Sequence, residues 1–101
     1  MKESALCPRL AKAMELIGKR WTALIIHQLL DGPQRFNAIE SALPISGRLL
    51  SERLKELEKE RVVERKVYSE VPIRVEYSLT EKGLSLEGAV REIEKWAQKW
   101  I

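Results

Sequence analysis

The 101-residue sequence predicts a mainly helical domain that carries one small β-hairpin, an α+β arrangement. Apolar residues recur at spacings of three and four through most of the chain, as they do on the buried face of an amphipathic helix. Two valine- and tyrosine-rich stretches, 62–69 and 73–79, are the only strand-like ones, and they follow one another directly. A chain of this length supports one modest core, so we expect a single domain over residues 1–101.

Composition describes an ordinary globular chain, with 45% apolar and 33% charged residues. No apolar run approaches the roughly 18 residues that span a bilayer, and the first residues lack the apolar core of a signal peptide. We therefore expect a cytoplasmic protein without membrane contact. A formal charge of +3 favours nucleic acid only weakly, so the positions of the basic residues must decide.

Two helices are expected in the first 30 residues. The first follows Pro8 and ends at Gly18, with Leu10 and Met14 at helical spacing. The second, over residues 21–30, is apolar on nearly every side and ends at a Gly-Pro pair. We expect this second helix to be central and buried.

A pair of helices separated by a very short turn follows. The third helix, over residues 35–43, breaks before Pro44, because proline disfavours helical geometry in the residue that precedes it. The fourth begins at Ser46, a candidate N-cap, and repeats leucines on one face.

The second half of the chain predicts a hairpin and a closing helix. A three-residue link joins the two strands, and residues 73–79 alternate cleanly between apolar and polar. From Thr80, a candidate N-cap, we expect one helix to the end of the sequence. Two helices, a helix-turn-helix pair, a hairpin and a long last helix form the order of a winged helix-turn-helix domain.

The fourth helix carries a polar face opposite its leucines. Because a helix fits the major groove and arginine donates two hydrogen bonds to a guanine edge, Arg48 and Ser51 are candidates for base readout. Ser46, at the positive end of the helix dipole, suits a phosphate. Lys55 is a candidate clamp on the DNA backbone. The alternative is that this face is simply the solvated side of an amphipathic helix.

Three further basic residues are candidate DNA contacts outside this helix. Strand alternation turns Arg74 away from the face of Val75 and Tyr77, so near the hairpin tip it can reach a groove or a phosphate. Lys66 can assist it, or it can be a charge that keeps an edge strand from aggregating. Arg35, just before the third helix, is a weaker phosphate candidate.

The sequence resembles the HxlR-type family of bacterial winged-helix transcription regulators. The matching pieces, in family order, are "CP", "LIGKRWTALII", "DGPQRFNAIE", "ISGRLLSERLKELE", "VVERKVYSEVPIRVEYSLTEKG" and "EIEKWAQKW". The resemblance implies a homodimer joined by its first and last helices on a pseudo-palindromic double-stranded DNA operator. It also places Ser46, Arg48 and Ser51 at the start of the recognition helix, and Arg74 in the wing.

The cysteine of the "CP" pair, Cys7, is the only cysteine of the chain. Family members with this start look like sensors of quinones, electrophiles or oxidants, in which the N-terminal thiol reacts and repression is relieved. Pro8 suits the first helical position, where the helix dipole together with Arg9 and Lys12 favours the thiolate. Alternatively, Cys7 is a small apolar residue packed against its leucine neighbours, Leu6 and Leu10. With no second cysteine, oxidation must give an adduct or a disulfide between two chains.

The leading hypothesis is therefore a repressor whose DNA binding is relieved when Cys7 is oxidised or alkylated. Two alternatives remain: the same fold responding to a different small ligand with Cys7 structural, and a protein-interaction module without DNA affinity. We expect no enzyme activity, metal or cofactor, because His27 is the only histidine and the sequence supplies no nucleophile for it. Trp96 and Trp100 are expected in the dimer core.

Overall fold

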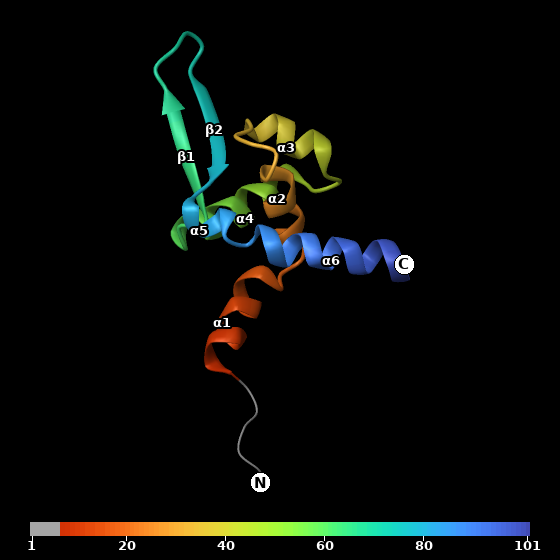
Figure 1. The fold of residues 1–101 in the computed structure, drawn as a ribbon. Helices are drawn as coiled ribbons and strands as arrows, with labels where there is room; N and C mark the ends of the chain where they lie inside the picture. The colour runs from red at the N-terminus through yellow and green to blue at the C-terminus, as the bar shows by residue number, and fades with distance from the viewer. Residues whose placement is uncertain (1–6) are drawn as a thin grey trace.

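The computed structural model describes residues 7–101. The elements in chain order are α1 (Pro8–Ile17), α2 (Thr22–Leu29), α3 (Phe36–Ala42), α4 (Gly47–Lys59), β1 (Val63–Tyr68), β2 (Arg74–Leu79), α5 (Glu81–Leu84) and α6 (Glu87–Trp100). Figure 1 shows α2, α3 and α4 grouped beside the hairpin, with α1 and α6 projecting from this body in different directions. The expected winged helix-turn-helix architecture is confirmed.

Helix α2 lies at the centre of the body, as its apolar sequence predicts. Its Ile25, Ile26 and Leu29 are almost fully buried. The rest of the core comes from α3, α4 and the base of the hairpin: Ile39, Ile45, Leu50, Leu54, Leu57, Val62, Val63 and Leu79. Burial of these side chains is the main stabilising contribution to the fold.

The helix-turn-helix pair is formed by α3 and α4. Helix α3 ends where Leu43 turns to extended backbone, directly before Pro44. Ser46 caps α4, because its Oγ accepts a hydrogen bond from the amide of Leu49 at 3.2 Å. The leucines of α4 face the core, and its polar side remains at the surface.

Strands β1 and β2 pair antiparallel, from Val63 opposite Leu79 to Tyr68 opposite Arg74. A single residue, Gln34, also pairs with β2, which the sequence patterns did not indicate. The amide of Gln34 donates to the carbonyl of Tyr77 at 2.9 Å, and the reverse bond measures 2.8 Å. This isolated bridge fastens the wing to the residues that lead into α3.

The expectation of one continuous helix from Thr80 is wrong. Thr80 caps a helix as expected, accepting at Oγ1 from the amide of Gly83 at 3.1 Å, but α5 ends at Leu84 and α6 starts at Glu87. A Cβ atom on Gly83 would collide with the carbonyl oxygen of Val62, so α5 packs tightly against the base of the hairpin. The chain must turn before α6 can leave the body.

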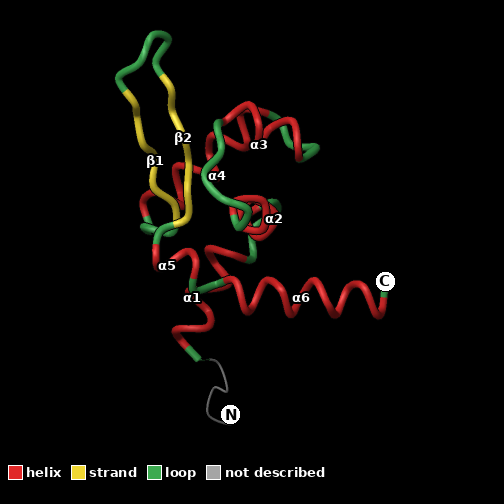
Figure 2. The backbone as a smooth tube through the Cα atoms, turned by 45° about the horizontal axis from the view of Figure 1, so that its top comes forward, coloured by secondary structure: helices red, strands yellow, loops and turns green. Residues whose placement is uncertain are grey.

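Helices α1 and α6 expose apolar side chains. Within the described range 7–101, neither of these two helices buries any residue. Leu10 and Met14 of α1 are about half exposed, as are Trp96 and Trp100 of α6. Figure 2 shows α6 as a rod extending from the body, with its C-terminal part beside no other element. Exposed apolar surface on this scale is typical of an interaction face.

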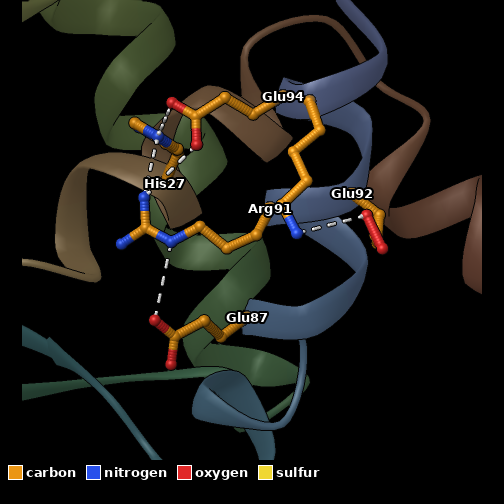
Figure 3. Close-up of polar contacts among 6 residues, drawn as sticks. His27, Glu87, Arg91, Glu92 and Glu94 are labelled. Carbon is orange, nitrogen blue, oxygen red and sulfur yellow. Dashed lines mark hydrogen bonds and ion pairs between the residues drawn. The ribbon is translucent and has the colours of Figure 1, made fainter.

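A polar cluster attaches α6 to α2 (Figure 3). His27 Nε2 lies 3.0 Å from Glu94 Oε2 and 3.4 Å from Arg91 Nη1, and Arg91 also approaches Glu87. Because the ionised carboxylate of Glu94 can only accept, the shorter contact is a hydrogen bond donated by His27 Nε2, and Arg91 Nη1 then lies near Nε2 without donating to it. This bond, followed by the Arg91 contact, holds the pKa of Glu94 below its usual value.

Candidate DNA interface and thiol site

The start of α4 presents a donor-rich surface. Ser46 is exposed, and while its oxygen caps the helix its hydroxyl proton stays available as a donor. The side chain of Arg48 is 91% exposed and has a single long ion pair, 3.6 Å from Nε to Glu52 Oε1. Lys55 is exposed and Ser51 half-buried. These placements agree with the expected polar face, and contact with DNA stays a prediction.

Arg53, which the sequence patterns did not single out, bonds α4 to the turn before α2. Its Nε donates to the carbonyl of Arg20 at 3.2 Å, and its side chain is only 17% exposed. Glu56, one turn further along, lies 3.0 Å from the ammonium of Lys19. These bonds connect α4 to the turn between α1 and α2. The Arg53–Glu56 spacing was visible in the sequence, but the partners in the distant turn were not.

The turn that these bonds reach has an unusual backbone. Trp21 adopts a positive φ of 80°, in the left-handed region that residues with a side chain rarely use. The guanidinium of Arg20 lies over the Trp21 ring, 5.0 Å from its centroid. A residue with a side chain keeps this costly backbone conformation only where the surrounding structure enforces it.

Arg74 lies near the hairpin tip, as expected, but its guanidinium is already paired with acidic side chains. Its Nε and Nη2 donate to the carboxylate of Glu70, the shorter bond measuring 2.8 Å, and its Nη1 donates to Glu76 at 2.6 Å. The guanidinium also stacks on Tyr68, 3.8 Å from the ring centroid. The bonds to the two carboxylates raise the pKa of Arg74, and Arg74 lowers the pKa of Glu70.

The other two basic candidates near the wing are Lys66, which is ion-paired, and Arg35, which is exposed. Lys66 pairs with Glu64 at 3.1 Å, and the hydrogen bond to that carboxylate raises the lysine pKa. Arg35 is exposed at the N-cap position of α3, and its charge also helps to lower the pKa of Glu70. Arg35 and the hairpin tip therefore face a common region.

Cys7 is exposed and occupies the N-cap position of α1, with Pro8 at the first helical position. Its carbonyl accepts from the amide of Ala11 at 2.9 Å, and its side chain makes no capping bond. Leu6, one of the two packing partners considered above, lies outside the described residues. Leu10, the other, is 55% exposed, so Cys7 is not part of the core described here.

An open groove of about 590 Å³ separates α1 from the C-terminal end of α4 and from α5. Its lining contains the apolar residues Leu16, Val62 and Leu86 together with lysines and glutamates. Lys12 and Lys59 are among these lysines. Within residues 7–101, no three His, Cys, Asp or Glu side chains gather closely enough to bind a metal, and no helix is long and apolar enough to cross a membrane.

The model of the HxlR-like helix-turn-helix family matches residues 16–101. The chain belongs to the HxlR-like family. The HTH-type transcriptional regulator YvaP of Bacillus subtilis (strain 168) is 59% identical over 100% of this chain and 94% of its own length. YodB, a transcriptional regulator of the same organism, is 48% identical over 96% of this chain and 88% of its own.

Solved structures of YodB share the HxlR fold seen here. The reduced form of B. subtilis YodB aligns with a TM-score of 0.84 at 49% identity, covering 94% of each chain. The quinone-bound form aligns with a TM-score of 0.80 at 47% identity, covering 94% of this chain and 100% of that one. The resemblance to the HxlR-type family stated from the sequence is confirmed, and the chain is a transcriptional regulator of that family.

Proposed function

We propose that the protein is a homodimeric, sequence-specific DNA-binding repressor that leaves its operator when Cys7 is oxidised or alkylated by quinones. The observation that carries this proposal is the exposed Cys7 thiol at the positive end of α1, a helix whose described residues are all at least partly exposed. A reaction there changes a surface that the chain itself does not cover. The quinone-bound structure of YodB supports the same class of effector.

The dimer is proposed to form through the apolar faces of α1 and α6. Leu10 and Met14 on α1, together with Ile93, Trp96 and Trp100 on α6, supply aromatic and aliphatic side chains of the kind enriched in interface cores. Two-fold pairing presents two copies of α4 to half-sites about 34 Å apart, on a pseudo-palindromic operator in the cytoplasm.

At each half-site, α4 is proposed to enter the major groove. Arg48 and Ser51 read base edges, while Ser46 and the amides of the first turn of α4 hold a phosphate. Lys55 and Arg35 contact the DNA backbone, and Lys66 with Arg74 extends the contact from the wing. The exposure of Arg48 supports its role, since only one long ion pair must be given up.

Two reactions of Cys7 are chemically open. The thiolate adds to a quinone ring carbon, forming a carbon–sulfur bond, and the ring takes up a proton to become a hydroquinone adduct. Alternatively, the Cys7 thiols of two subunits lose two protons and two electrons to an azo oxidant such as diamide, which becomes the hydrazine as the disulfide forms. Both reactions begin from the thiolate.

A path from Cys7 to the recognition helix supports the coupling. Helix α1 leads into the turn of Lys19 and Arg20, which is bonded to Glu56 and Arg53 of α4. A displacement of α1 therefore acts on α4 through direct bonds as well as through the dimer face.

The test is a mobility-shift assay on DNA upstream of the protein's own and neighbouring genes, with and without a quinone or diamide. We expect wild type to be released and Cys7→Ser to stay bound, since the hydroxyl is not a comparable nucleophile. Arg48→Ala serves as the matched control, losing operator binding without any reagent. Normal release of Cys7→Ser by the quinone would refute the sensing role, and the absence of binding to every fragment would refute DNA binding.

The groove beside α1 favours one alternative, release by a different small ligand with Cys7 structural. Its lining combines apolar side chains with four lysines and three glutamates, a small excess of positive charge that suits an amphipathic anion. Release of Cys7→Ser from DNA by a non-electrophilic aromatic carboxylate would support this alternative.

A further inference from the structure

The hairpin face that carries Arg74 holds more acids than bases. Residues two apart on a strand, and directly opposed cross-strand pairs, share a face of the hairpin. By this rule Glu64, Lys66 and Tyr68 of β1 face the same way as Arg74 and Glu76 of β2. Glu70, from the connecting loop, folds back onto Arg74. This face of the wing, with the loop residue Glu70, therefore presents three glutamates against two basic side chains.

Glu70 and Glu76 form, with Arg74 between them, a unit that we name the wing clasp. Its two carboxylates against one guanidinium leave a net charge of −1. Glu70 occupies the Nε–Nη2 edge, an edge that a phosphate also uses for paired hydrogen bonds. In this arrangement Arg74 offers no net attraction to a DNA backbone.

We propose that Glu70 and Glu76 determine specificity by holding Arg74 away from DNA that lacks the operator. This inference rests on the proposed DNA-binding function. At a non-specific site the clasp stays closed and the wing adds little affinity. At the operator, where α4 is seated in the groove and holds the wing against the DNA backbone, phosphate oxygens replace the carboxylate of Glu70 and Arg74 joins the contact.

The structure shows why the clasp can open. Glu70 is exposed and lies in the loop between the strands, so its movement disturbs no ladder bond. The charge of Arg35 also attracts the carboxylate of Glu70, though the two side chains form no ion pair in this structure. The Glu70 side chain is 50% exposed, and an ion pair to such an exposed carboxylate contributes little to stability, so a phosphate can compete with Glu70 for Arg74.

The experiment compares wild type, E70Q, E76Q and E70Q/E76Q for binding to operator and to scrambled DNA across a range of salt. Freeing Arg74 in both subunits adds two phosphate contacts, which steepens the slope of log affinity against log salt by about 1.8. Between about 50 and about 200 mM salt, this makes scrambled-DNA affinity about tenfold more salt-sensitive than in wild type. Operator affinity changes less, so the ratio of operator to scrambled binding falls.

The same glutamate substitutions in an R74A background are the matched control. If the carboxylates act through Arg74, E70Q/E76Q has no further effect on scrambled-DNA affinity there, whereas simple removal of negative charge would raise affinity in both backgrounds. A readout without DNA is the exchange of the Arg74 Nε proton in nitrogen-15 NMR, which we expect to be slowed in wild type and fast in E70Q.

Three results would overturn the inference. Equal gains with and without Arg74 would show a general charge effect, and unchanged scrambled-DNA affinity would show that the clasp does not restrain Arg74. A loss of operator affinity in E70Q would show that the clasp aims Arg74 at DNA instead. If wild type binds its operator and any of these three results is found, only this inference is refuted. If wild type binds no DNA at all, the proposed function is refuted as well.

Discussion

Replacing Arg53 with alanine removes one of the two bonds that connect α4 to the turn between α1 and α2. The Nε bond to the Arg20 carbonyl is 3.2 Å long, whereas the Nη1 contact to Glu56, at 3.5 Å, is too long to count fully. A hydrogen bond from a charged donor contributes about 1.5 kcal/mol at the lower end of its usual range. For a domain near 100 residues this corresponds to a fall in Tm of about 6–12 °C.

Arg48 is the internal control for this prediction. Its side chain is on the same helix but 91% exposed, so Arg48→Ala should change the unfolding free energy by less than about 0.5 kcal/mol. Thermal unfolding by circular dichroism, at one protein concentration, measures both variants. In operator binding the order of the two variants is reversed: Arg48→Ala is expected to lose more affinity than Arg53→Ala. Equal Tm values for the two variants would refute the assignment of Arg53 as a brace.

Three further predictions address the packing of the closing segment. Gly83→Ala should lower the free energy of unfolding by about 1–3 kcal/mol in urea titration, because its Cβ meets the Val62 carbonyl; unchanged stability would contradict this close approach. Because the pKa of Glu94 is lowered in the folded protein, its ionised carboxylate stabilises the fold at pH values above 4.5, its ordinary pKa. The free energy of unfolding should therefore fall as the pH drops below 4.5, and Glu94→Gln should flatten the acid side of a Tm–pH profile. Trp96→Glu should convert the dimer to monomer in analytical ultracentrifugation, while a variant that stays dimeric would place the interface elsewhere.

Local signals in the sequence were sufficient for most of the fold. Ser46 and Thr80 were identified as caps because a cap depends on residues within one turn. The buried faces of α2 and α4 followed from the spacing of their apolar side chains. Family motifs then connected these elements to a class of regulator.

Contacts between distant segments explain what the sequence patterns missed. The helix break after Leu84 follows directly on Gly83, which packs on Val62 across the base of the hairpin, a contact that no local pattern reveals. The clasp around Arg74 depends on a loop whose path brings Glu70 back to the strand. Strand alternation placed Arg74 on the correct face, but it carries no information on which charges already occupy that side chain.

The bridge between Gln34 and Tyr77 has a kinetic consequence. Because the wing is hydrogen-bonded to the chain that enters α3, and the hairpin also packs on α4, the hairpin and the recognition helix belong to one rigid unit. If the proposed DNA binding is correct, we expect the backbone of the hairpin and α4 to engage or leave the proposed half-site together, while the side chain of Arg74 can still exchange its partners. Dissociation of a half-site followed by stopped flow should accordingly show one exponential phase.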